Sequence, residues 1–185
     1  MLTDKLMIIL FGLIFLLMIA CSDSSEPVNQ QTAAIAPPLK ENRSKAAFLD
    51  YAASTNMLQI ELARLAMERG QSEEVRKIGK QALEFHAGAL DSLRLALGAA
   101  DYGSLPDSLG AADRAIVEEF RNVPAAEFDA RYRQYLISAH TAQLERYQEV
   151  LLKTEEETIR NWIRQVQEQL RERVQVTAKA DTVSL

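Results

Sequence analysis

The sequence has few of the residues from which active sites and nucleotide sites are usually built. It contains one cysteine, so no disulfide can form within the chain and the fold must be held by packing alone. None of its 7 glycines lies in a phosphate-binding glycine-rich loop, and no serine stands in the Gly-x-Ser-x-Gly turn of hydrolases. We therefore expect no catalytic residues and no enzymatic activity.

Basic residues are also fewer than acidic residues. The chain has 21 Lys and Arg against 26 Asp and Glu, which gives a net charge of −5. A nucleic-acid interface needs a basic stripe to neutralise phosphates, and electrostatic attachment to anionic lipid needs a polybasic segment. The balance of charge therefore argues against a nucleic-acid partner and leaves acyl chains as the predicted route to a membrane.

The N-terminal stretch predicts an exported lipoprotein. Lys5 precedes an unbroken apolar run, Leu6–Ala20, which is shorter than the roughly 20 apolar residues of a spanning helix. Cys21 follows this run as the acylated cysteine follows the signal peptide of bacterial lipoproteins. We predict that residues 1–20 are a signal peptide and that Cys21 is the lipidated mature N-terminus. The alternative is an ordinary secretory signal followed by a coincidental cysteine.

The residues after Cys21 indicate location and a tether. Ser22, rather than Asp, favours the outer membrane by the sorting rule of enteric bacteria, with the domain facing the periplasm. Up to Arg43 the chain is polar, without periodicity, and interrupted by Pro37 and Pro38. Such composition cannot bury enough apolar surface to fold, so residues 21–43 are predicted to be the lipidated cysteine and a disordered linker.

Apolar residues at alternating steps of three and four predict long amphipathic helices over residues 44–177. The expected helices cover residues 44–70, 73–97, 107–120, 125–153 and 154–177. Gly70 and Pro124 separate neighbours, and Thr154 with Glu157 has capping-box spacing. No segment alternates with period two, so the prediction is all-α, a four-helix bundle with a short extra helix in the crossover. Residues 178–185 are expected to form a flexible tail.

One motif in the third long helix is specific enough to suggest a family. It is Phe128-Asp129-x-x-Tyr132, followed by His140 on the same helix. Further matching residues are Phe48, Ala52, Glu61, Leu65, Ala66, Val75, Glu84, Phe85, His86, Leu105 and Pro106. From Phe48 to Val174 the chain resembles the bacterial family called domain of unknown function 4142, often labelled predicted outer membrane proteins. The resemblance implies a ferritin-like helical bundle in the cell envelope.

This chain departs from the family pattern at two positions. Gln59 stands where relatives commonly carry Glu, and Arg173 stands where many carry a His late in the last helix. Any metal site imagined for the family would lose ligands here.

The two histidines were tested as metal ligands by their spacing. Ferritin-like di-iron sites use Glu-x-x-His, because residues three apart share a helix face. Leu83 and Ile137 occupy those positions before His86 and His140, so neither histidine has a carboxylate partner on its own helix. A mixed site of His86, His140 and Glu61 for Fe, Mn or Zn is geometrically possible. The alternative is that both imidazoles lie in the core, paired with a hydroxyl, a carboxylate or each other.

The sequence therefore leaves three functions open. The leading one is a lipid-anchored, non-enzymatic binding or stress-related module, and the alternative is a ferritin-like metal or redox protein using His86, His140 and Glu61. The third is a partner-binding module that uses the crossover, Tyr102–Phe120. Tyr132, Tyr135 and Tyr147 are interpreted as packing residues rather than as an aromatic box for a cofactor.

Overall fold

The computed structural model describes the backbone of residues 30–102 and 105–183. The predicted signal peptide and the predicted lipidation site, Cys21, lie outside these residues. The described helices are α2 (Gln30–Arg69), α3 (Glu73–Tyr102), α4 (Ala111–Asn122), α5 (Ala125–Leu151) and α6 (Glu157–Val183). No strand occurs in the described ranges, which confirms the all-α prediction. No described helix combines the length and apolarity needed to cross a membrane.

The chain divides into two compact units, Met1–Glu41 and Asn42–Leu185, and all the core residues belong to the second. Helix α2 begins at Gln30, whereas the sequence analysis assigned residues up to Arg43 to a disordered linker. Alanines at positions 33, 34 and 36 are strong helix formers, and this propensity favours a helix in a segment whose polarity and prolines suggest disorder.

The C-terminal helix is also longer than predicted. Helix α6 continues to Val183, although residues from 178 were expected to form a flexible tail. Ala178, Lys179 and Ala180 have high helix propensity, so the helix extends beyond the last apolar contact that the sequence pattern could register.

The helix boundaries inside the domain lie within a few residues of the predicted ones. Gly98, with φ of 65°, breaks the regular helical conformation of α3 directly after the predicted end of that helix. Helix α4 begins at Ala111, not at residue 107, because Gly110 is its extended N-cap. The hydroxyl of Thr154 accepts from the amide of Glu156 (3.3 Å), and α6 itself begins at Glu157.

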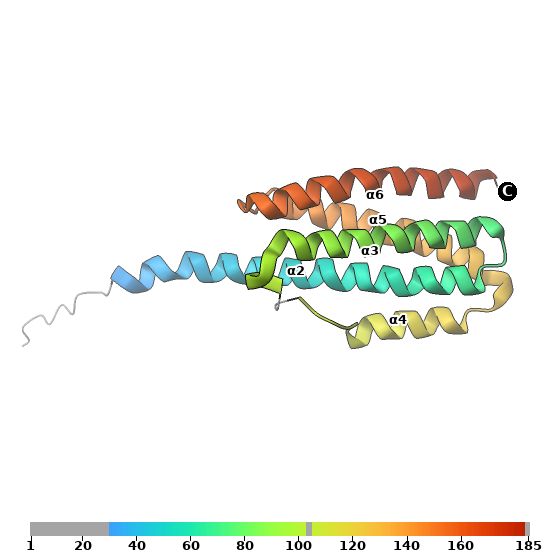
Figure 1. Cartoon of the computed structure of the whole chain (residues 1–185), viewed down its shortest axis with the longest axis horizontal. Helices are drawn as coiled ribbons and strands as arrows, with labels where there is room; N and C mark the ends of the chain where they lie inside the picture. Colours follow the sequence, from blue (N-terminus) through green and yellow to red (C-terminus); the bar gives the residue numbers. More distant parts are fainter. Residues whose placement is uncertain (1–29, 103–104, 184–185) are drawn as a thin grey trace, which may run out of the picture. The chain divides into compact units, whose positions relative to one another are not determined.

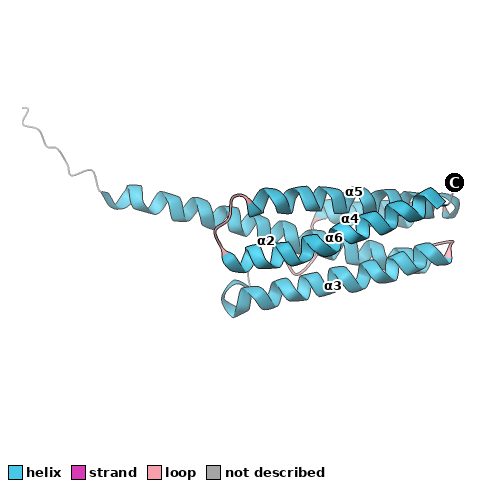
Figure 2. Cartoon of the chain, turned by 90° about the horizontal axis from the view of Figure 1, so that it is seen from above, coloured by secondary structure: helices cyan, strands magenta, loops and turns pink. Residues whose placement is uncertain are grey.

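Within the second unit, α2, α3, α5 and α6 lie side by side in both views (Figures 1 and 2). The first residues of α3 and α5, such as Val75 and Phe128, share one core cluster. Residues near their ends, such as Leu93 and Tyr147, share the other. Helices α3 and α5 therefore run parallel, and the segment that contains α4 leads the chain from the end of α3 back to the start of α5 (Figure 1).

Two apolar clusters hold these helices together. The first joins α2, α3, α4 and α5, and the second joins α2, α3, α5 and α6. Large fully buried members are Phe48, Leu49, Leu62, Leu93, Phe128, Tyr132, Leu136, Tyr147, Ile163 and Leu170. Trp162 of α6 donates its indole N–H to the carbonyl of Ala89 (3.2 Å) and to the hydroxyl of Ser92 (3.0 Å). This pair of bonds satisfies the one polar atom of the indole and connects α6 to α3.

The Phe-Asp-x-x-Tyr motif has a structural role at the first turn of the bundle. Phe128 and Tyr132 stack with ring centroids 6.2 Å apart inside the first cluster. The carboxylate of Asp129 accepts from the amides of Gln71 and Ser72, both at 2.8 Å. The motif therefore joins the start of α5 to the turn between α2 and α3.

Candidate functional site

The two histidines meet at the centre of the bundle. His86 of α3 and His140 of α5 are 0% and 1% exposed, and their Nε2 atoms lie 3.0 Å apart. The two residues lie at the same level along the parallel helices α3 and α5, so their rings face each other. This is one of the outcomes that the sequence analysis left open, in which the imidazoles are paired with each other.

Both imidazoles are neutral at pH 7. Burial lowers the pKa of His86 well below its ordinary value, and the nearby His140 and Arg173 lower it further. Burial, with a smaller contribution from Arg173, lowers the pKa of His140 to about 4. A charged imidazole would lose its hydration here without gaining a carboxylate partner.

The hydrogen-bond chain assigns a proton to each ring. Asn56 of α2 donates its Nδ2 to the carbonyl of Ala52 (2.7 Å), so its Oδ1 faces His86 Nδ1 at 2.8 Å. An amide oxygen only accepts, so His86 carries its hydrogen on Nδ1 and offers a lone pair at Nε2. His140 must then donate from Nε2, which leaves its Nδ1 as an acceptor. That atom is buried and has no hydrogen-bond partner.

Other polar side chains are buried close to this height in the bundle. Gln59 and Gln143 are at most 2% exposed, and the Oε1 atom of each has no partner. Gln143 donates its Nε2 to the hydroxyl of Tyr147 (2.8 Å). Burial raises the pKa of Tyr132 and of Tyr147, so both phenols stay protonated. The centre of this bundle is therefore polar and uncharged rather than purely apolar.

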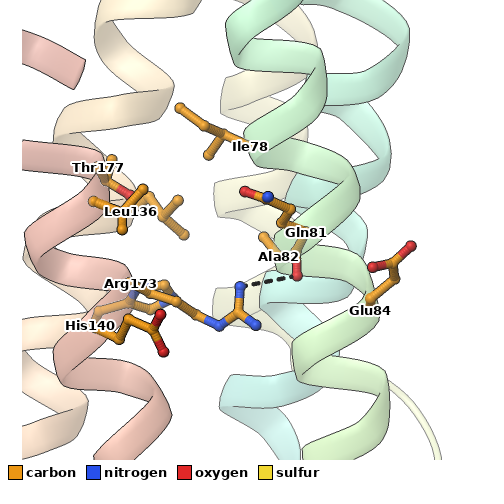
Figure 3. A pocket seen from close by; sticks show the side chains of 10 residues that line it. Ile78, Gln81, Ala82, Glu84, Leu136, His140, Arg173 and Thr177 are labelled. Carbon is orange, nitrogen blue, oxygen red and sulfur yellow. Dashed lines mark hydrogen bonds between the residues drawn. The ribbon is translucent and has the colours of Figure 1, made fainter.

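A pocket of about 330 Å³ opens beside His140, between α3, α5 and α6 (Figure 3). Its lining residues are Ile78, Gln81, Ala82, Glu84, Leu136, His140, Glu172, Arg173, Val176 and Thr177. In Figure 3, Arg173 reaches from α6 toward α3, where its Nη1 donates to the carbonyl of Gln81 (3.2 Å). The pocket therefore extends from the exposed side chains of Glu84 and Glu172 to the buried side chain of His140.

Arg173 is the only cation among these lining residues. Its guanidinium carbon lies 4.4 Å from the centroid of the Phe85 ring, and its buried Nε has no hydrogen-bond partner. Burial lowers the pKa of Arg173, while the carboxylates of Glu172 and Glu84 act in the opposite direction. The guanidinium is thus positioned by the Phe85 ring and by the carbonyl of Gln81, and its buried Nε donor has no partner in the structure.

The structure does not bring Glu61 to the histidines. Asn56 is the α2 residue that faces His86, and a position five residues further on is turned by about 140° around a helix of 3.6 residues per turn. The carboxylate of Glu61 is instead paired with Arg64. Across the part of the chain that the structure describes, no group of three or more His, Cys, Asp or Glu is placed to hold a metal ion.

The three tyrosines considered as an aromatic box do not gather at one site. Tyr147 belongs to the second core cluster. Tyr132 belongs to the first, and Tyr135 packs against the outside of that cluster beside Phe120, with ring centroids 5.1 Å apart. Each therefore has a separate packing role.

Sequence reasoning missed Asn56, and it treated Arg173 as a departure from the family pattern rather than as a residue of a site. A signal for Asn56 was available, since it follows Ala52 by one helical turn on an apolar stripe and so predicts a buried amide. No local signal marks Arg173, because its partners Gln81 and Phe85 belong to another helix.

Comparison with known proteins supports the resemblance stated from the motifs. Neither the search of curated proteins nor that of solved structures gave a match. Residues 28–179 match the family described as Domain of unknown function (DUF4142), so the match includes α2, α3, α4 and α5 and all but the last residues of α6. The chain belongs to the DUF4142 family.

Proposed function

We propose that this protein is a non-enzymatic binding module, a ferritin-like four-helix bundle held at the cell envelope by acyl chains on Cys21. The observation that carries the binding role is the pocket of about 330 Å³ between α3, α5 and α6, whose lining includes His140, Arg173 and the carboxylates of Glu84 and Glu172. Small-molecule sites are usually concave, with apolar walls and a few polar groups, which is the composition of this lining.

The ferritin-like description rests on the order and direction of the helices. Helices α3 and α5 run parallel, and the connection that makes this possible carries α4. Ferritin-like bundles have one long crossover of this kind between their second and third long helices. A stress-related role for the module is compatible with this fold but has no residue of its own to support it.

The proposed anchor is tested by replacing the acylated residue. Cys21→Ser should move the protein from the membrane fraction to the soluble envelope fraction of producing cells, because one thiol carries the whole attachment. Ser24→Ala in the same segment is the control and should stay with the membrane. A Cys21→Ser protein that still sediments with membranes would refute the anchor.

The binding role is tested on the full chain purified in detergent. A panel of small polar molecules is screened by thermal unfolding, since a ligand that binds only the native state raises stability by mass action. Arg173→Met removes the donor and keeps much of the stem, and Arg171→Met on the same helix is the matched control. Stabilisation that is lost in Arg173→Met and kept in Arg171→Met supports the proposal, and a panel without any hit refutes it.

A second candidate is the metal or redox function with Fe, Mn or Zn. It is favoured by one observation, the two neutral Nε2 atoms that face each other at 3.0 Å. Neutral imidazole is the metal-binding form, but the nearby Arg173 charge opposes a cation.

Metal analysis of protein prepared without chelator tests this second candidate. The His86→Ala/His140→Ala double variant is the comparison. A protein that carries no metal, and gains no thermal stability from any of the three metals, does not have this function.

A further inference from the structure

We propose that the side chain of Arg173 is a strap that closes the polar centre of the bundle. This side chain crosses from α6 to α3 (Figure 3). In that position it covers His140, and it must swing outward before water or a ligand in the pocket can reach the histidine pair. The inference concerns access to the pocket of the proposed function, and its meaning for ligand binding rests on that function.

The guanidinium of Arg173 lies against the histidine pair, and the ring of Phe85 shows this. The centroid of that ring is 4.4 Å from the guanidinium carbon of Arg173. It is 4.8 Å from the ring centroid of His86 and 6.4 Å from that of His140. The guanidinium and both imidazoles therefore gather around one aromatic ring. The positive charge of Arg173 also lowers the pKa of each histidine, as expected for a group close to both.

His140 lines the pocket and yet is only 1% exposed. A residue in the wall of an open pocket normally meets solvent, so a neighbouring side chain must cover it. In Figure 3 the side chain that spans the pocket between α6 and α3 is that of Arg173, and His140 lies beside it. Arg173 is therefore the side chain that we assign as the cover.

The closed position is held by two modest contacts. Nη1 of Arg173 donates to the carbonyl of Gln81 at 3.2 Å, the long end of the range for such bonds, and the guanidinium makes a cation–π contact with Phe85. Its Nε is buried without a partner. Burial also lowers the pKa of Arg173, because the charged form loses hydration there. An outward rotamer would remove both of these unfavourable effects.

The mouth of the pocket offers the guanidinium a second set of partners. Glu84 and Glu172 are exposed residues of the lining, and the carboxylate of each raises the pKa of Arg173. When the strap swings outward, its guanidinium regains water and can form charge-assisted hydrogen bonds with these carboxylates. Arg173 thus has an inner and an outer position with different partners.

Opening the strap changes the surface that a ligand meets. With the strap closed, the pocket offers a guanidinium and aliphatic residues such as Leu136 and Val176. With the strap open, the wall also includes the neutral imidazole of His140. The strap therefore controls access to an uncharged hydrogen-bonding group in the core.

Chemical modification of the histidines tests the strap, because the chain contains only two. Diethyl pyrocarbonate acylates a neutral imidazole that it can reach, and mass spectrometry locates the modified residue. The full chain in detergent is treated at pH 7, and in the wild type both histidines should react slowly. In Arg173→Ala, His140 should react at least tenfold faster. His86 is outside the lining of the pocket and should stay slow.

Three further variants serve as controls. Arg171→Ala removes an exposed arginine of the same helix and should react as the wild type does. Arg69→Lys disturbs the contact of α2 with the end of α4, so it shows whether a loss of stability alone speeds the reaction, and we expect that it does not. Arg173→Lys keeps the charge but loses the planar guanidinium, and His140 should react at an intermediate rate.

Three outcomes would overturn the inference. Arg173→Ala may leave the rate at His140 unchanged, which would mean that Arg173 is not the cover. Equal rates at both histidines would point to unfolding, which exposes both. Rapid reaction of His140 in the wild type would show that nothing covers it. None of these outcomes bears on the screen of small molecules. Selective reaction of His140 together with a screen without any hit would support the strap and refute the binding function.

Discussion

His86 and His140 share a single hydrogen between their Nε2 atoms, 3.0 Å apart, at a place where neither ring reaches water. Asn56 determines which ring donates this hydrogen. Its amide oxygen accepts from Nδ1 of His86, so Nε2 of His86 carries a lone pair and His140 is the donor. Hydrogen bonds therefore link the carbonyl of Ala52, Asn56, His86 and His140 in series. The series ends at the buried Nδ1 of His140, a residue that lines the pocket.

Asn56→Ala should destabilise the protein by about 1–3 kcal/mol, because it leaves the Nδ1–H of His86 buried without an acceptor. Asn122→Ala is the matched control, since Asn122 also donates to a carbonyl one turn earlier but is exposed. Its effect should stay within about 0.5 kcal/mol. Urea unfolding of both variants makes the comparison, and equal losses would contradict the assigned network.

Acidification should destabilise the protein below pH 6.5. The unfolded state binds protons with an ordinary histidine pKa of about 6.5, whereas the folded state keeps the pKa of His140 near 4 and that of His86 well below 6.5. The unfolded state therefore binds more protons between these values, so the free energy of unfolding falls as pH falls. The slope is at most about 1.4 kcal/mol per pH unit for each histidine.

Urea unfolding between pH 7 and pH 5 measures this slope, since carboxylates contribute mainly at lower pH. The His86→Gln/His140→Gln double variant has no group that titrates in that window within the pair. Its stability should be nearly flat from pH 7 to pH 5. A wild-type profile that is equally flat would show that the two histidines are hydrated and that their pKa values are close to that of an exposed histidine.

Gly79→Ala should destabilise the crossing of α2 and α3 by roughly 1–3 kcal/mol, the usual cost of overpacking. A Cβ on Gly79 would lie 2.9 Å from the Ala66 Cβ and 3.0 Å from the Ala63 carbonyl, and neither can move without the helix backbone. Gly88→Ala on the same helix meets nothing within 4 Å and should stabilise the protein by about 0.5–1 kcal/mol. Thermal unfolding should therefore give shifts of opposite sign, and shifts of the same sign would contradict the packing.

Arg69→Lys should cost roughly 1.5–3 kcal/mol, because an ammonium group cannot replace the planar set of donors. Arg69 donates Nη1 to the carbonyls of Phe120 and Arg121 (both 2.6 Å) and Nη2 to that of Val123 (2.7 Å). These bonds satisfy the C-terminal end of α4. Arg64→Lys, at an exposed ion pair on α2, is the control and should be close to neutral in urea unfolding.

Much of the fold was predictable because it is encoded locally. The apolar stripes predicted the helices, and Gly70 and Pro124 predicted two of the boundaries between them, since each of these signals depends on neighbouring residues. The prediction failed where composition was used instead, at residues 30–43, which belong to helix α2. Polarity and proline suggested disorder there, but alanine propensity acts on the same segment.

The sequence by itself determined an all-α chain, its family, and two histidines on the inner faces of different helices, because periodicity and motifs are read along one dimension. Only the tertiary structure decided that the two rings pair with each other and with Asn56, that Glu61 points elsewhere, and that Arg173 forms the wall of a pocket. These contacts join residues from separate helices. Their geometry depends on how the helices are aligned and rotated in the bundle, which no local pattern specifies.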